Sequence, residues 1–291
     1  GIDPGRTLVI VVSKSFTTFE TLSNARLVRQ WMQDADLSEA YCTQHFYAVT
    51  SQVERAISFG IESCHILPMW DAVGGRFSLW SGVSLVLAMV LGMDNFQQLL
   101  AGAYAMDEHF KSAQLQYNMP VILAMLGIWY GNFLQSPTQA ILPYTDNLKY
   151  LPNFLQQLHM ESLGKSVTKQ GETISHSSGR IIWGGVGTHS QHSFHQLLMQ
   201  GTHLVPADFI LPVFSEKGQR NNELIAHCFA QSEALWNGTG ALKANGLSDD
   251  LLVKHQTIKG GRPSTILLCD QLTPFSLGAL VALYEHKVFV Q

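Results

Sequence analysis

A hydroxyl-rich turn near the start of the chain has the residue types that bind a phosphate group. The run Ser13-Lys-Ser-Phe-Thr-Thr18 follows the apolar residues 7–12 and precedes a helical pattern that begins near Glu20. The β-branched apolar run predicts a buried strand, so the turn stands where a helix begins. Backbone N–H groups and the positive end of the helix dipole meet there, and four hydroxyls and a lysine could complete a phosphate site. An ordinary serine or threonine helix cap is the alternative interpretation.

Two further clusters carry groups suited to sugar chemistry. In Gly74-Gly75-Arg76, glycine lets a backbone approach a ligand and arginine keeps its charge, although a tight turn with a surface arginine fits equally. Gln157 and Glu161 are four residues apart in an amphipathic stretch, so both side chains are expected on one helix face. A glutamate is ionised at neutral pH, the form that a general base requires, whereas a solvent-facing glutamate near a helix end is the alternative.

A third cluster, Gln191-His192, lies in a segment with histidines at positions 189, 192 and 195. Imidazole exchanges protons near neutral pH, which suits acid–base work on a sugar ring. Three histidines could instead offer nitrogens to zinc, as in a zinc hydrolase. Spacing of three drifts around a helix, and no H-E-x-x-H motif completes such a site. A helix start with histidines at a subunit surface is the third interpretation.

With these clusters the chain resembles the glucose-6-phosphate isomerase family, also called phosphoglucose isomerases. The resemblance runs from end to end and rests on five segments in family order: residues 13–21, 70–81, 159–165, 187–196 and 272–291. It implies an α/β fold of two sugar-isomerase-type domains, each a mainly parallel sheet between helices in three αβα layers. Residues 1–92 would be the latter part of the first domain, and residues 93–291 most of the second.

The resemblance implies interconversion of glucose 6-phosphate and fructose 6-phosphate through a cis-enediolate, in glycolysis and gluconeogenesis, without a metal or other cofactor. Glu161 would move the proton between C2 and C1, and Arg76 would stabilise the enediolate. His192 would open the sugar ring from the neighbouring subunit, which makes a homodimer part of the active site. Substrate-binding roles are implied for Ser13, Lys14, Ser15, Thr18, Gly75 and Gln157.

The sequence departs from the family pattern in three places. Ser15 stands where the family commonly has threonine, and His189-Ser190 where it commonly has Asn-Gly. The family also has a glycine-rich phosphate turn before this region and a catalytic lysine after it, and neither is in these 291 residues. We therefore expect a piece of a longer enzyme. For the piece alone, a non-catalytic phosphosugar-binding module is the alternative to an isomerase.

The composition fits a packed globular protein, with 46% hydrophobic and 14% charged residues. A formal net charge of −4 gives no support for nucleic-acid or anionic-membrane partners. The four cysteines are widely spaced without a C-x-x-C pair, which favours a reduced, cytoplasmic location. The apolar stretches 79–93 and 119–134 are shorter than the ~20 residues that a membrane span needs, and we expect largely buried helices there.

Alternating apolar periods predict an α/β order of elements with parallel sheets. Strands are expected at residues 8–12, 46–50, 139–142, 181–183, 209–213 and 265–269. Helices are expected at residues 20–33, 78–91, 95–106, 120–134, 148–160, 190–200, 222–236 and 274–286. Residues 215–222 and 254–263 are expected to be polar loops.

Overall fold

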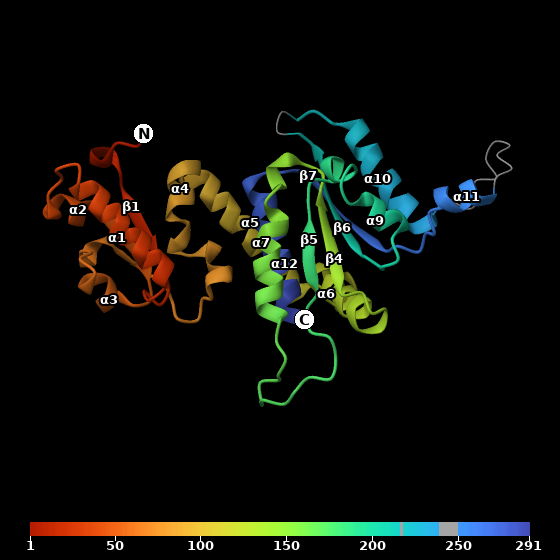
Figure 1. Cartoon of the computed structure of the whole chain (residues 1–291), viewed down its shortest axis with the longest axis horizontal. Coiled ribbons are helices and arrows are strands. Elements are labelled where there is room, and N and C mark those ends of the chain that lie inside the picture. The colour runs from red at the N-terminus through yellow and green to blue at the C-terminus, as the bar shows by residue number, and fades with distance from the viewer. Residues whose placement is uncertain (216–217, 239–249) are drawn as a thin grey trace. The chain divides into compact units, whose positions relative to one another are not determined.

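The computed structural model describes residues 1–215, 218–238 and 250–291. The chain forms two compact units, unit 1 (Gly1–Phe96) and unit 2 (Gln97–Gln291) (Figure 1). Each unit holds a parallel sheet packed against helices, so the expected α/β class is confirmed. The assignment of residues 1–92 and 93–291 to parts of two sugar-isomerase-type domains stays a prediction.

The sheet of unit 1 has three parallel strands in the order β1-β2-β3. Helices α1, α2 and α3 supply side chains to a core on one face, centred on Phe46 and Met32, which are fully buried. The bounds are β1 (Val9–Val12), β2 (Phe46–Thr50), β3 (Ile66–Pro68), α1 (Phe19–Gln33), α2 (Glu39–His45) and α3 (Val53–Ser58). Strand β3 was not expected, because its three residues end at a proline and are too short to show an alternating pattern.

The prediction of a single helix at residues 78–91 is wrong. The segment forms two 3-10 turns, Gly75–Trp80 and Gly82–Ser84, and only α4 (Leu85–Leu91) is α-helical. The Ser78 and Ser81 hydroxyls donate to the carbonyls of Gly75 and Ser78, at 2.5 and 2.7 Å. Such local side-chain bonds compete with the α-helical ladder. Helix α4 is also less buried than expected, since Met89 and Val90 are 63% and 76% exposed.

The sheet of unit 2 has four parallel strands in the order β5-β4-β6-β7. One face carries a core of residues such as Phe209 and Leu142 packed against helices α9 and α10. The strands are β4 (Thr138–Pro143), β5 (Ile181–Gly184), β6 (Ala207–Phe214) and β7 (Ser264–Gln271), with α9 (His195–Gln200) and α10 (Asn222–Asn237). The bounds of all four strands lie within two residues of those expected from the sequence.

The other face of this sheet is covered by α7 and α12, so unit 2 has three layers (Figure 1). Helix α6 packs on α12, and α7 continues into the π-helical turn Gln157–Glu161. The bounds are α5 (Met93–Ser112), α6 (Met119–Ile128), α7 (Leu151–Gln156), α8 (Gly187–Ser190), α11 (Asp250–Gln256) and α12 (Pro274–Val290). Helix α11 overlaps the loop expected from residue 254, and part of the expected loop at 215–222 lies outside the described residues.

The helices and the cysteines bear on two expectations from the sequence, namely that no segment spans a membrane and that the cysteines are reduced. None of the helices in the described ranges is long and apolar enough to cross a membrane. The four cysteines, all of them in described parts of the chain, are free thiols.

Candidate active site

The turn Ser13–Thr18 is fixed to the carboxyl end of the unit 1 sheet. The backbone carbonyl of Lys14 accepts hydrogen bonds from the Thr50 hydroxyl at 3.0 Å and from the backbone N–H of Ser51 at 3.1 Å. At the middle of the turn, Phe16 has a φ of 49° and a buried ring that packs edge-on against Phe59 at 5.8 Å. A non-glycine residue with positive φ is uncommon, and here the aromatic contact holds it. The turn is therefore anchored through its backbone and Phe16, and Ser13 is buried whereas the other three hydroxyls of the turn are exposed.

The hydroxyls of the turn bond to one another. The Ser13 hydroxyl donates to the Thr18 hydroxyl at 3.3 Å, and the Ser15 and Thr17 hydroxyl oxygens are 2.8 Å apart. Thr18 is the N-cap residue of α1, yet in the described chain its side chain does not cap the helix. Ser15, Thr17 and Thr18 are exposed. The turn thus presents hydroxyls and first-turn N–H groups together at a 15-residue helix, which suits an anion.

Lys14 connects this turn to the loop that contains Gly74-Gly75-Arg76. Its ammonium group donates to the backbone carbonyl of Asp71 at 2.5 Å, in the loop that follows β3. Five residues later Arg76 lies in the 3-10 turn, with its guanidinium 5.3 Å from the centre of the Phe77 ring. Gly75 faces open space, since a Cβ added there would meet no atom within 4 Å. The turn Ser13–Thr18 and the loop that carries Gly74-Gly75-Arg76 are therefore neighbours in unit 1.

Gln157 and Glu161 share one face of their helix in unit 2, as the spacing predicts. The Gln157 amide Nε2 donates to Oε2 of Glu161 at 3.1 Å, and both side chains are exposed. The five residues from Gln157 to Glu161 are π-helical, a geometry that occurs as single turns and is frequent at functional sites. Sequence patterns do not distinguish a π turn from an α turn, so this feature was not expected. It leaves the Glu161 carboxylate facing solvent beside an amide.

His159, between Gln157 and Glu161, is a residue that the sequence analysis did not single out. Its ring is buried, and its Nε2 accepts the backbone N–H of Arg180 at 3.3 Å. Burial, and then the positive charges of Lys287 and Arg180, lower the pKa of His159 to about 3. The neutral imidazole therefore ties the π turn to the residue that precedes β5, and holds the segment that carries Glu161.

A buried polar network lies behind this histidine. The Gln139 side-chain oxygen accepts from Nη2 of Arg180 at 2.7 Å and from Nζ of Lys287 at 3.2 Å. The Asp208 carboxylate accepts the Tyr284 hydroxyl at 3.0 Å and lies 3.8 Å from Nζ of Lys287. Burial lowers the pKa of Lys287 to about 8. A lysine inside the apolar pattern of α12 was the one sequence signal for such a network.

Replacing His159 by glutamine is expected to weaken the fall in the free energy of unfolding that occurs as the pH drops below 7. The folded protein resists protonation of His159 down to about pH 3. The unfolded chain takes up that proton near pH 6.5, so it binds more protons between these values and stability falls as pH falls. Wild type should lose about 2 kcal/mol more than the variant between pH 7 and pH 5. Urea unfolding at both pH values measures this, with the exposed His176→Gln as control. Equal pH slopes in wild type and His159→Gln would contradict the assignment.

His192 lies in an exposed turn between α8 and α9, where a continuous helix over 190–200 was expected. The side chains of His189, His192 and His195 do not converge on one position. His195 is buried with its Nε2 3.0 Å from the Ser190 hydroxyl, and burial lowers its pKa. His189 is exposed and lies 3.8 Å from the Asp146 carboxylate. Among the described residues these three do not form a cluster with metal-binding spacing, so the zinc alternative loses its geometric basis.

Glu161 and His192 lie in segments near opposite ends of strand β5. Helix α7 returns from the carboxyl end of β4, and the π turn reaches the amino end of β5, where His159 meets Arg180. The chain then passes along β5 before it arrives at the turn that holds His192. Strand β5, four residues or about 13 Å long, lies between the two segments. The segments that carry Glu161 and His192 therefore meet the sheet at different ends of β5.

The phosphoglucose isomerase family model matches residues 1–291, the whole chain. The chain belongs to this family. It is 50% identical to glucose-6-phosphate isomerase of Shewanella amazonensis and 48% identical to that of Shewanella pealeana. The crystal structure of a glucose-6-phosphate isomerase from Chlamydia trachomatis superposes with a TM-score of 0.88 at 41% identity.

All three alignments cover 100% of this chain but 55% of the relative, so the chain spans about half the length of the phosphoglucose isomerases it matches. The resemblance that the five sequence segments indicated is therefore confirmed at the level of the family and of the fold. The roles of the individual site residues stay predictions, because their support is the local geometry described above.

Proposed function

We propose that the protein is a glucose-6-phosphate isomerase, which interconverts glucose 6-phosphate and fructose 6-phosphate in glycolysis and gluconeogenesis. The observation that carries this proposal is the Glu161 carboxylate, exposed on a π turn beside the Gln157 amide. An aldose–ketose isomerase needs one such carboxylate to move a proton between C2 and C1 through a cis-enediolate. Membership of the phosphoglucose isomerase family supports the same substrate class.

Each remaining step has a proposed residue. Arg76 stabilises the oxyanion of the enediolate, with a charge that needs no cofactor, and Gly75 lets the sugar approach the backbone. Gln157 orients the sugar beside Glu161, and His192 exchanges a proton with the ring oxygen when the ring opens. The phosphate is held by the turn hydroxyls and the N-terminus of α1, and its binding energy positions the reacting carbons. The proposed anchor consists of Ser13, Lys14, Ser15 and Thr18.

The proposed active unit is a homodimer in which His192 comes from the partner subunit. Support comes from the position of Glu161 and His192 near opposite ends of strand β5 in one copy of unit 2. A twofold axis can bring the amino end of β5 in one copy beside the carboxyl end of β5 in another without any further component. The exposure of both side chains fits groups that complete a site only on assembly.

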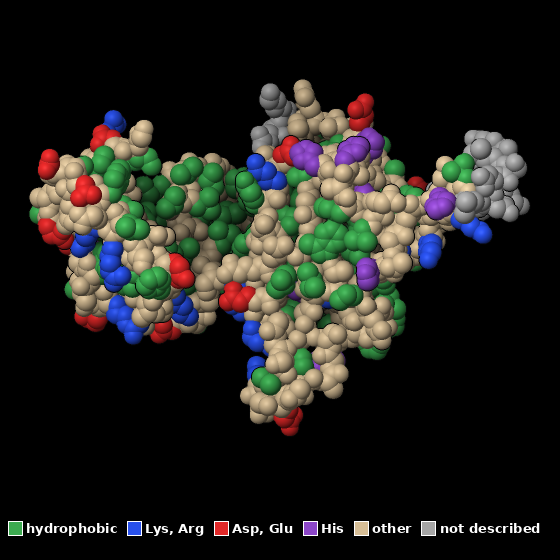
Figure 2. All heavy atoms as spheres, viewed as in Figure 1, with side chains coloured by type: hydrophobic (Ala, Val, Ile, Leu, Met, Phe, Trp, Pro, Cys, Tyr) green, Lys and Arg blue, Asp and Glu red, His purple; other side chains and the backbone are tan. Residues whose placement is uncertain are grey.

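We further propose a cytoplasmic enzyme with a small sugar phosphate as its ligand and neither nucleic acid nor membrane as partner. The free cysteines fit a reducing compartment. On the face drawn in Figure 2, unit 1 carries both basic and acidic side chains. The net charge of −4 agrees with this distribution.

A coupled isomerase assay beside calorimetry with fructose 6-phosphate tests the proposed function. The protein as its gene encodes it should bind fructose 6-phosphate and convert it to glucose 6-phosphate. Binding with no turnover would contradict the isomerase and indicate a non-catalytic phosphosugar-binding module. Failure of both binding and turnover would contradict the assignment of the phosphate anchor as well.

Replacement of Thr18 by valine is expected to raise KM for fructose 6-phosphate, because a hydroxyl that bonds the phosphate is lost. A hydrogen bond to a charged group contributes about 1.5–3 kcal/mol, which corresponds to roughly 10- to 100-fold in KM. Stability should change little, since this hydroxyl does not cap α1 in the described chain. Steady-state kinetics measure the change, with Thr43→Val in α2 as the matched control. An unchanged KM for Thr18→Val would exclude the hydroxyl from the anchor.

A further inference from the structure

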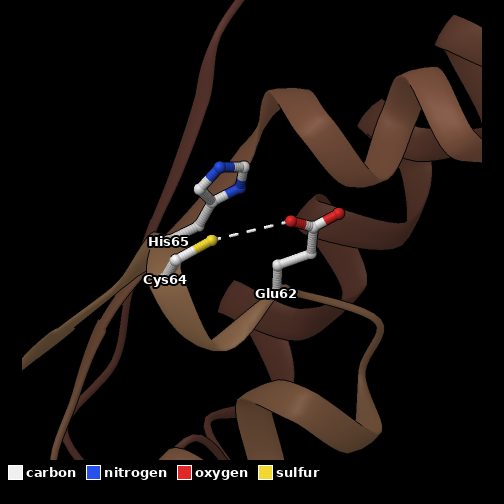
Figure 3. A group of neighbouring side chains, drawn as sticks. All are labelled: Glu62, Cys64 and His65. Carbon is white, nitrogen blue, oxygen red and sulfur yellow. Dashed lines mark hydrogen bonds between the residues drawn. The ribbon is translucent and has the colours of Figure 1, made fainter.

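A second cluster of chemically active side chains lies in unit 1, on the short turn before β3. Glu62, Cys64 and His65 belong to the 3-10 turn Ser63–His65 and its N-cap residue (Figure 3). Their ligand atoms all lie within 4.8 Å of one another, and within the described ranges they are the one group of three with this property. The Cys64 thiol donates to Oε2 of Glu62 at 3.6 Å.

The imidazole of His65 is held in place and has an unused nitrogen. Its ring stacks on Tyr47 of β2, with the centroids 4.2 Å apart and the planes at 18°. Its Nδ1 is buried and has no hydrogen-bond partner among the described residues. A buried ring nitrogen without a partner is costly, so its lone pair or proton calls for a ligand. Figure 3 shows the ring over the Cys64 thiol, on the side of the turn where the Glu62 carboxylate lies.

We propose that Glu62, Cys64 and His65 bind a zinc-type divalent cation through one oxygen, one sulfur and one nitrogen. Zinc takes these ligands in a tetrahedron with Zn–S near 2.3 Å and Zn–O near 2.0–2.2 Å, which places S and O about 3.5 Å apart. The Cys64 and Glu62 ligand atoms are already 3.6 Å apart. Thiolate and imidazole disfavour Mg²⁺ and Ca²⁺, which prefer oxygen ligands. Water fills the fourth position of this open site.

Binding exchanges a proton for the metal at Cys64. The thiol loses its proton to solvent as the sulfur–metal bond forms, so no oxidant or reductant takes part. Cys64 and Glu62 are exposed, which gives the cation a path into the site. The affinity should therefore rise with pH as the competing proton becomes scarce.

The expected effect is stabilisation of unit 1 without a change in turnover. The cluster precedes β3, whereas the loop that holds Arg76 follows the other end of that strand. Metal binding would fix the turn that leads into β3, and a ligand that binds only the folded state raises its melting temperature. This inference rests on no step of the proposed isomerase reaction.

Cobalt titration of the tag-free protein tests the site, because Co²⁺ replaces zinc and shows a thiolate charge-transfer band. We expect one equivalent of Co²⁺ to produce the band and Zn²⁺ to remove it. The band should be absent in Cys64→Ser and retained in Cys269→Ser, which removes a half-buried thiol of unit 2. No band in wild type, or an unchanged band in Cys64→Ser, would overturn the proposal.

Two measurements cover the case in which a variant folds poorly. In wild-type protein, Zn²⁺ should protect Cys64 from iodoacetamide, as mass spectrometry of the peptide shows, without protecting Cys269. His65→Phe keeps an aromatic ring against Tyr47 but removes the nitrogens, and its metal affinity should fall at least about tenfold. Equal alkylation of Cys64 with and without Zn²⁺ would contradict the site, as would an unchanged affinity in a folded His65→Phe.

Discussion

Replacement of Glu161 by glutamine is expected to lower kcat at least about 1000-fold, because a positioned general base contributes about 100- to 10,000-fold and here works in both directions of proton transfer. Glutamine has nearly the same shape and can still accept the hydrogen bond from Gln157. The dissociation constant for fructose 6-phosphate should therefore stay within about threefold, since the phosphate anchor lies elsewhere. A coupled assay and calorimetry measure these two quantities on the same preparation.

Glu172→Gln is the matched control for this variant. Glu172 is exposed in the same unit and has no role in the proposed reaction, so its replacement should leave turnover unchanged. Solvent exchange gives an independent test, because a base that shuttles the proton lets hydrogen from water appear at C2 of the sugar. Turnover like that of wild type in Glu161→Gln would remove the carboxylate from the mechanism.

Mixing two inactive variants is expected to restore activity if the active site is shared between subunits. Glu161→Gln and His192→Ala each remove one group from every site of a homodimer. In a heterodimer of the two, one site carries both defects and the other carries neither. Random reassociation makes half of the dimers heterodimers, so about a quarter of wild-type activity should return.

Refolding each variant alone is the control, and it should leave activity at about 1% or below. A mixture of Glu161→Gln with Arg76→Ala indicates whether these two residues act in the same chain, in which case activity should not return. No recovery in the mixture of Glu161→Gln with His192→Ala would mean that both residues serve a site within one chain. The position of the two residues near opposite ends of β5 would then not reflect a site shared between subunits.

Much of the fold could be predicted from the sequence, because most of its strands contain an apolar run. Six of the seven strands in the described ranges were expected, and the parallel order follows from their alternation with helices. The wrong helix at 78–91 and the missed β3 share a cause: local hydroxyl bonds and a proline decide the backbone there, not apolar periodicity. Helix α2 was missed because its seven residues are too few for a periodic pattern.

The candidate site could be predicted only in its local parts. The spacing of Gln157 and Glu161 placed them on one helix face, and the structure shows the hydrogen bond between them. The contact of Lys14 with the loop after β3 joins residues 57 positions apart, which no local pattern contains. The role of His159 depends on burial against Lys287 and Arg180, and these contacts also arise only in the folded chain.

A crystal structure of the protein with fructose 6-phosphate bound tests the central claim most directly. We predict that a Glu161 carboxylate oxygen lies within about 3.5 Å of C1 and C2, with the phosphate on the Ser13–Thr18 turn. A different carboxylate at those carbons, with Glu161 out of reach even through one water molecule, would contradict it.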